Sequence, residues 1–323
     1  MNFIYMVIGF VLLIKGADWL VGSASKLAKS FGISTLIIGL SVVAFGTSAP
    51  EATIGIFSGI KHTNAITLGD VVGSSIANIA LIIGISALIS QLTVDRSILK
   101  KELPMSFAIQ VLFFALAVIG EVVSRFDGML LLAFFLFFLY YLWNSTRKSS
   151  TEMIEENESS EVNSEETNDI RLNVKYRFKQ VLFLGIGLAC LILGGNIVVD
   201  SSINIAQAFG LSEALIGVTI VALGTSLPEL VTCVVAALKK ESDIAVGNII
   251  GSNIFNILFV LGLSSTINPI KMVRGVYLDI AAMLISTLLL YGLAVFHKRV
   301  TRFGGVALVG FYILFIVYKV ITI

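Results

Sequence analysis

The chain has 323 residues, of which 57% are hydrophobic and 13% are charged, and its mean hydropathy is +0.96. Soluble domains have about one quarter charged residues, so this composition excludes an ordinary soluble protein and indicates an integral membrane protein. The net charge of +1 argues against nucleic acid as a partner. The two cysteines, Cys190 and Cys233, lie in apolar segments, where neither a disulfide framework nor a thiolate metal site is expected.

Polar breaks divide the chain into apolar segments that are each near the ~20 residues a helix needs to cross a bilayer. The first segment lacks a basic start and a cleavage site, so we interpret it as a retained span rather than a signal peptide. We therefore predict an all-α integral membrane protein with ten transmembrane helices. In chain order they are expected at residues 3–22, 34–59, 65–90, 104–123, 127–144, 178–198, 212–237, 243–267, 273–295 and 303–320.

A polar, glutamate-rich stretch separates the fifth and sixth predicted spans. Its low hydrophobicity and high charge predict a soluble linker rather than a folded domain. The chain is thus expected to consist of a first five-helix unit at residues 1–145, an acidic linker at 146–176 and a second five-helix unit at 177–323.

An internal repeat relates the two units. Residues 31–90 align with 209–268 without a gap, with 23 identities in 60 positions, so equivalent residues are 178 apart. Each unit holds five predicted spans, and an odd number means that the second copy enters the membrane upside down. This is the inverted-repeat plan of many secondary transporters, whose substrate site lies at the midplane between the repeats.

The basic residues predict the orientation. Sixteen of the 22 Lys and Arg residues fall in loops on the side of the 146–176 linker. Because positive charge marks cytoplasmic loops, we expect that linker to be cytoplasmic and both termini to be external.

Two glutamates lie inside long apolar spans, where a charged side chain is not expected. Glu51 ends Gly-Thr-Ser-Ala-Pro-Glu at 46–51, and Glu229 ends Gly-Thr-Ser-Leu-Pro-Glu at 224–229. The 11 residues from Glu51 to His62 span about 16 Å of helix, which places Glu51 near the midplane. A carboxylate at that depth costs about 2.5–3.5 kcal/mol on insertion scales, so both acids are functional candidates.

The proline before each glutamate predicts a broken helix. Pro50 and Pro228 lack an N–H and clash with the carbonyl four residues earlier. We expect kinks there that free carbonyls of Ala44 or Gly46 and of Ala222 or Gly224 for use as oxygen ligands.

Hydroxyl and amide side chains recur around the two acids. Thr47 and Ser48 are expected to share the helix face of Glu51, and Ser74 shares a face with Asn78. Only oxygen ligands are present, which suit Ca²⁺, Na⁺ or Mg²⁺ rather than zinc or copper, and the two negative charges match one divalent cation. The candidate side chains are Thr47, Ser48, Glu51, Ser74 and Asn78, with Thr225, Ser226, Glu229, Ser252 and Asn256 in the second unit.

These motifs resemble the sodium/calcium exchanger family, within the wider calcium/cation antiporter superfamily. The match includes Gly-Ser-x-Ile-x-Asn at 73–78 and at 251–256. The resemblance implies electrogenic exchange of several Na⁺ ions for one Ca²⁺ by alternating access. It also implies that the ligands include Ala44 and Ala222 beside the ten residues above. Some members carry Asp where this chain has Asn256, which makes potassium dependence less expected here.

Other functions stay open from the residues alone. A proton/Ca²⁺ exchanger would use the same glutamates, and a cation channel would use similar oxygens. An enzyme is not expected, because a hydrolase based on Ser48 or Ser226 needs a nearby base and both histidines lie at membrane edges. The expected partners are the lipid bilayer and the transported Ca²⁺ and Na⁺, without a cofactor. Asp70 is interpreted as the N-cap of the third span, with an ion-entry role as the alternative.

Overall fold

The computed structural model describes residues 2–158, 174–208, 222–272 and 275–322. Within these residues eight helices are long and apolar enough to cross a membrane, and a bent pair at Thr35–Thr47 and Ala49–Ile60 makes a ninth when counted as one span. The all-helical membrane fold is therefore confirmed. The first part of the predicted span at 212–237 lies outside the described residues.

The first unit consists of five helices or broken helices. Its elements are α1 (Asn2–Phe31); α2 (Thr35–Ile38), η1 (Gly39–Val43), α3 (Ala44–Thr47) and α4 (Ala49–Ile60); α5 (Asn64–Ile76), η2 (Ala77–Ile83) and α6 (Gly84–Ile89); η3 (Ile98–Glu102) and α7 (Leu103–Gly120); and α8 (Arg125–Glu158).

The second unit follows the same order. Its described elements are α10 (Val174–Ala208); α12 (Ala222–Gly224) and α13 (Leu227–Leu238); α14 (Ser242–Phe255), η5 (Asn256–Leu261) and α15 (Gly262–Ile267); α16 (Val276–His297); and α17 (Arg302–Thr322). A shift of 178 residues carries α4 onto α13, and α6 onto α15.

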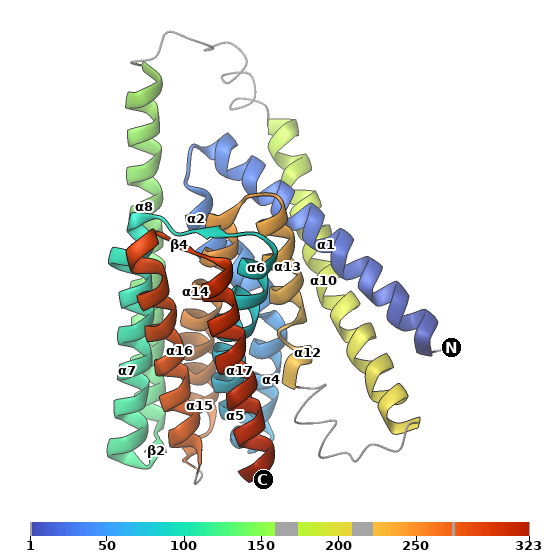
Figure 1. Ribbon diagram of the computed structural model, residues 1–323. Coiled ribbons are helices and arrows are strands. Elements are labelled where there is room, and N and C mark those ends of the chain that lie inside the picture. Colours follow the sequence, from blue (N-terminus) through green and yellow to red (C-terminus); the bar gives the residue numbers. More distant parts are fainter. Residues whose placement is uncertain (1, 159–173, 209–221, 273–274, 323) are drawn as a thin grey trace.

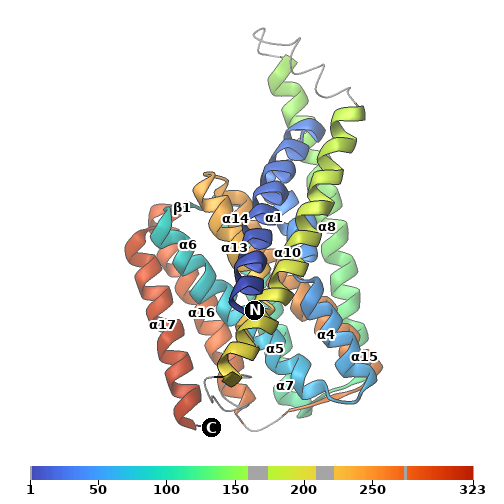
Figure 2. The ribbon, with the colours of Figure 1, turned by 90° about the vertical axis from the view of Figure 1, so that its right-hand side faces the viewer.

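The two equivalent hairpins point in opposite directions. The turn between α4 and α5 lies at one end of the bundle, and the turn between α13 and α14 lies at the other end (Figures 1 and 2). The broken helices α5–η2–α6 and α14–η5–α15 form the centre. In their most apolar 18-residue stretches, 72% and 94% of the residues are buried, respectively. The outer helices α7, α8, α16 and α17 surround one side of this centre (Figure 1).

Two very short ribbons join the units. Leu92–Thr93 (β1) pairs antiparallel with Arg299–Val300 (β4), and Val122–Val123 (β2) pairs with Ile270–Lys271 (β3). These strands were not expected from the sequence. They are too short to change the fold class, but each links a loop of one unit to a loop of the other.

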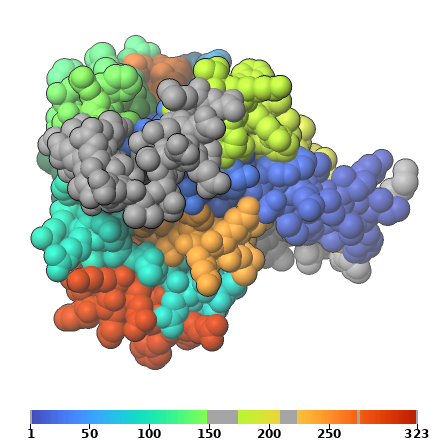
Figure 3. Space-filling model, turned by 90° about the horizontal axis from the view of Figure 1, so that it is seen from above, coloured from blue at the N-terminus to red at the C-terminus, as the bar shows by residue number. Residues whose placement is uncertain are grey.

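Helices α1 and α10 form a crossed antiparallel pair on the other side of the bundle (Figures 1 and 2). Seen from above, α1 extends beyond the rest of the molecule (Figure 3). The pair is held by glycines: a Cβ on Gly16 would lie 2.7 Å from the Gly187 carbonyl, and one on Gly194 would lie 2.8 Å from the Gly9 carbonyl. Small residues let transmembrane helices approach closely, which strengthens their van der Waals contact.

Helix α8 is longer than the predicted span at 127–144. It continues to Glu158 and so enters the segment expected to be linker, and α10 begins at Val174, within the same segment. No Gly or Pro occurs from 129 to 158, so nothing in the sequence stops the helix where the apolar residues end. The centre of the expected linker, 159–173, lies outside the described residues.

Candidate cation-binding site

The breaks predicted at the two prolines are present. Helix α3 ends at Thr47, α4 begins at Ala49, and the two parts are bent by 49°. In the second unit α12 ends at Gly224 and α13 begins at Leu227. Each break places its glutamate in the first turn of a new helix. The positive end of the helix dipole favours negative charge at that position.

Both glutamates are buried at the centre of the protein. Glu51 is 1% exposed and Glu229 is 0% exposed. Most of the remaining candidate side chains are buried too: Thr47, Ser48, Ser74, Asn78, Ser226, Ser252 and Asn256 are buried, and Thr225 is half-buried. Ala44 is buried as well, whereas the side chain of Ala222 lies outside the described residues. The π-helical turns η2 and η5 contain Asn78 and Asn256, and such turns are frequent at functional sites.

Hydrogen bonds connect the candidates of one unit with those of the other. The Ser48 hydroxyl donates to Glu229 Oε1 at 3.0 Å, and the Ser252 hydroxyl lies 3.5 Å from the same oxygen. The Asn256 amide donates to Ser74 Oγ at 3.4 Å. The structure thus brings the two predicted residue sets, which are about half a chain apart in sequence, into one site.

The pairing of Ser48 differs from the prediction. Ser48 was expected to share the helix face of Glu51, but it contacts Glu229 of the other unit. The reason is the break itself: Ser48 stands between α3 and α4 with φ −83° and ψ 12°, so the regular helical spacing to Glu51 does not apply. The backbone carbonyl of Ala44 was expected to be free to bind a cation. It instead accepts hydrogen bonds from Ser48 N at 3.0 Å and from Thr47 Oγ1 at 3.2 Å.

Among the described residues, no basic side chain forms an ion pair with the acids of the site. Glu51 lies close enough to Glu229 and Asp70 for direct charge–charge repulsion. The two ion pairs in the described part of the chain join Lys239 to Asp18 and Lys319 to Asp279, and neither involves these acids. A buried carboxylate is normally paired or coordinates a metal. The site therefore has the charge of a cation-binding centre.

Several oxygens of the site have no hydrogen-bond partner among the described residues. They are Glu51 Oε2, Asp70 Oδ2, Asn78 Oδ1, Ser226 Oγ, Glu229 Oε2 and Asn256 Oδ1. An unsatisfied buried polar atom costs about 1–3 kcal/mol, and more when it is charged. A hard cation satisfies several such oxygens at once, which is the coordination that Ca²⁺ and Na⁺ accept.

A protein-family model described as sodium/calcium exchanger protein matches residues 1–144 and 179–321. These ranges cover most of the chain and contain every candidate named above. The chain belongs to the sodium/calcium exchanger family.

Known proteins are similar to this family member over most of its length. The sodium/calcium exchanger MaX1 of Methanosarcina acetivorans is 35% identical over 342 residues, covering 98% of this chain and 97% of MaX1. The inner membrane protein YrbG of Escherichia coli is 38% identical over 267 residues, covering 82% and 79%. A solved structure of the sodium-calcium exchanger NCX_Mj, soaked with zero Na⁺ and Ca²⁺, superposes with a TM-score of 0.82 at 30% identity, covering 98% of each chain.

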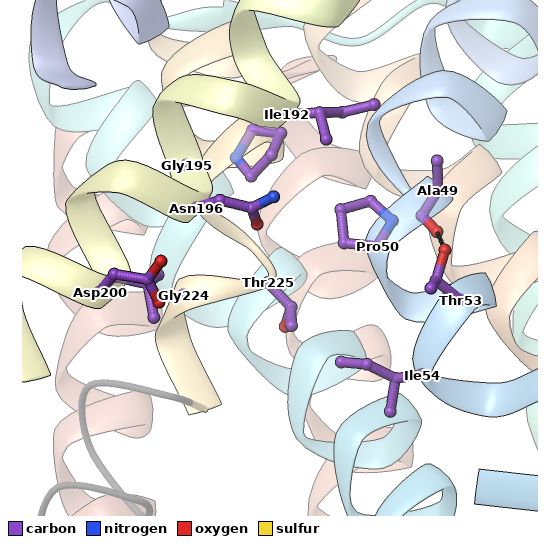
Figure 4. Close-up of a pocket in the computed structure, with 12 residues that line it drawn as sticks. Ala49, Pro50, Thr53, Ile54, Ile192, Gly195, Asn196, Asp200, Gly224 and Thr225 are labelled. Carbon is purple, nitrogen blue, oxygen red and sulfur yellow. Dashed lines mark hydrogen bonds between the residues drawn. The ribbon is translucent and has the colours of Figure 1, made fainter. Parts of the chain in front are cut away.

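A cavity of about 320 Å³ leads to one end of the site in this exchanger-family protein. It lies between α10, the first turn of α4 and the break before α13, and Thr225 is part of its wall. Figure 4 shows Pro50, Thr225 and Asn196 around this space, with Asp200 further along α10. The proline breaks therefore both position the glutamates and leave room beside them.

From the sequence, Asp70 was interpreted as an N-cap, with ion entry as the alternative, and it was not placed among the ligands. Helix α5 begins at Asn64 with Thr63 before it, so Asp70 is in the second turn and the N-cap interpretation is wrong. Its carboxylate accepts from Thr225 Oγ1 at 3.2 Å. A signal was available: Asp70, Ser74 and Asn78 are four residues apart and so lie on one helix face.

Proposed function

We propose that this protein is a secondary antiporter that exchanges Na⁺ for Ca²⁺ at a midplane site by alternating access. One observation carries the proposal: Glu51 and Glu229 come from opposite units and are both buried, with oxygens that lack a hydrogen-bond partner and without an ion pair to a basic side chain among the described residues. The sodium/calcium exchanger names of MaX1 and NCX_Mj support the choice of ions.

The proposed ligands are the two carboxylates with the amide, hydroxyl and backbone oxygens around them. One Ca²⁺ requires both carboxylates, whereas Na⁺ ions in its place would share the same oxygens. Since the same negative charges cannot neutralise both kinds of ion at once, binding is mutually exclusive, which is a physical basis for coupled exchange. The full set is Ala44, Thr47, Ser48, Glu51, Ser74 and Asn78, with Ala222, Thr225, Ser226, Glu229, Ser252 and Asn256.

The proposed architecture is ten transmembrane helices in two inverted five-helix repeats, at residues 1–145 and 177–323, joined by a cytoplasmic linker at 146–176. The opposite directions of the α4–α5 and α13–α14 hairpins support it (Figure 1). The glycine contact supports it as well. Gly9 lies against Gly194, and Gly16 lies against Gly187. The 178-residue shift carries Gly9 onto Gly187 and Gly16 onto Gly194, so it exchanges these two contacts. By the distribution of basic residues, the α4–α5 hairpin and both termini face the outside. We call this the outer face, and the face with the α13–α14 hairpin the inner face.

Reconstituted transport tests the proposal. Purified protein in proteoliposomes should move Ca²⁺ against its gradient when an opposing Na⁺ gradient is imposed. A pH gradient of equal size without Na⁺ should not drive this flux. Liposomes that contain Glu51→Gln protein serve as the control. Flux driven only by the pH gradient would identify a proton/Ca²⁺ exchanger instead, and flux that neither saturates nor needs a counter-ion would identify a channel.

Asn256→Asp should change ion stoichiometry or selectivity more than folding. The substitution keeps the shape of the side chain but adds a third negative charge to the proposed ligand set, so an additional cation charge is needed for neutrality. We expect a change in the Na⁺ dependence of Ca²⁺ flux and in the charge moved per Ca²⁺, with an unchanged elution profile in detergent. Unaltered Na⁺ and Ca²⁺ kinetics would remove this position from the site.

A further inference from the structure

We infer that Asp70 is a positioning residue that strengthens Na⁺ binding at Thr225 and makes the outer end of the site more attractive to cations than the inner end. The inference rests on the proposed exchange function and deepens it. It concerns a residue outside the ligand set given above.

The first step is the hydrogen bond between Thr225 and Asp70. A threonine hydroxyl has one hydrogen to donate and two lone pairs. Thr225 Oγ1 donates to Asp70 Oδ1 at 3.2 Å, so its lone pairs stay available for a cation. A carboxylate that accepts a hydrogen bond from a cation ligand orients that ligand and increases its electron density. Thr225 also lies beside Glu51 and in the wall of the cavity, where a cation arriving through that space would meet it.

The second step is the equivalent contact at the other end of the site. Thr47 is the counterpart of Thr225, and Thr47 Oγ1 lies 3.1 Å from Asn248 Oδ1 and 3.2 Å from the Ala44 carbonyl, which share its one hydrogen. Asn248 is the counterpart of Asp70, 178 residues later. At both ends the threonine hydroxyl lies within hydrogen-bond distance of the side chain at the matched position, but that side chain is a carboxylate at one end and a neutral amide at the other. The two ends differ by one negative charge.

The third step is position. Asp70 is six residues into α5 from the outer hairpin, which is about 9 Å along the helix, and Asn248 is six residues into α14 from the inner hairpin. Glu51 is nine residues from the outer end of α4, about 14 Å, and so lies deeper than Asp70. The additional charge therefore lies between the outer face and the glutamate pair.

The fourth step is that no basic side chain of the described residues forms an ion pair with Asp70. Its second oxygen, Oδ2, is buried without a hydrogen-bond partner in the described part of the chain. Neither of the ion pairs among those residues includes it. The charged group that interacts with it is Glu51, which has the same sign. A negative charge in this setting acts on the next available positive group, which during transport is the bound cation.

Reciprocal substitutions separate this role from a structural one. Asp70→Asn keeps an acceptor for Thr225 and removes only the charge, and Asn248→Asp adds the charge at the other end. The half-saturating Na⁺ concentration for Ca²⁺ exchange is measured from each face, in right-side-out and in inside-out membrane vesicles from the same cells. Maximal rate and detergent-state melting temperature are recorded for every variant, and Asp70→Glu tests whether a carboxylate restores function.

Asp70→Asn should raise the half-saturating Na⁺ concentration at the outer face about tenfold. This is the lower end of the effects seen when a hydrogen-bond partner of a metal ligand is removed. The value at the opposite face should stay within about twofold of wild type, and Asp70→Glu should recover part of the loss. Asn248→Asp should lower the Na⁺ requirement at the opposite face. Equal effects of Asp70→Asn at both faces, or a change in melting temperature and maximal rate alone, would overturn the inference. If Asp70→Asn does not fold, an unchanged Na⁺ requirement in Asn248→Asp overturns it. Absence of Na⁺-driven flux in the wild type would instead defeat the proposed function.

Discussion

Glutamine at position 51 or 229 should abolish Ca²⁺ binding. Each substitution is nearly isosteric but removes one of the two charges that neutralise a divalent cation, in a site where no described basic side chain forms an ion pair with either glutamate. Removing one partner of a buried charge pair costs about 3–5 kcal/mol, which corresponds to a loss of affinity of roughly 100- to 4,000-fold. Isothermal titration of Ca²⁺ into detergent-solubilised protein measures this loss directly, and Ca²⁺ uptake into proteoliposomes measures its effect on transport.

Glu102→Gln is a matched control for the two glutamate variants. Glu102 is also buried, at 4% exposure, but it is the last residue of η3, directly before α7, and accepts from Tyr141 Oη at 2.7 Å. Its substitution should leave Ca²⁺ affinity within about twofold of wild type, although some stability is lost with the charge-assisted hydrogen bond. Near-normal Ca²⁺ exchange by both Glu51→Gln and Glu229→Gln would remove these residues from the site.

Leucine at position 16 should separate α1 from α10 and destabilise the protein. Even a Cβ there would lie 2.7 Å from the Gly187 carbonyl and 2.9 Å from Leu191 N, and both of these atoms belong to the backbone and cannot rotate away. Overpacking of this kind typically costs about 1–3 kcal/mol, and more where backbone must move. We expect a lower melting temperature in detergent and a large loss of Na⁺-driven Ca²⁺ flux.

Gly185→Leu provides the comparison on the same pair of helices. Gly185 is on α10 only two residues from Gly187, but it is exposed and a Cβ there meets no described atom within 4 Å. Leucine also has a higher helix propensity than glycine. Gly185→Leu should therefore melt at or above the wild-type temperature. Equal behaviour of the Gly16→Leu and Gly185→Leu proteins would contradict the close glycine contact.

Much of the candidate site was predictable because its signals are local. A glutamate in an apolar span, a proline one residue before it and a second copy 178 residues later are all visible in the sequence. Proline breaks a helix wherever the helix occurs, so the two bends could be expected from Pro50 and Pro228 alone. The unexpected features are those that depend on packing between the units. The hydroxyl of Ser48 bonds to Glu229 rather than facing Glu51, and Asp70 bonds to Thr225 rather than capping its own helix.

The sequence by itself determined the membrane class, the repeat, the two buried acids and the oxygen chemistry that points to a hard cation. Those features follow from hydropathy and from the types of residue present, which do not depend on how the helices meet. Only the tertiary structure decided which oxygens come together, because each of these contacts joins residues more than 150 positions apart. Two antiparallel units can pack in several registers with the same hydropathy. The hydrogen bonds across the centre, and the glycine contact between α1 and α10, specify the register that forms.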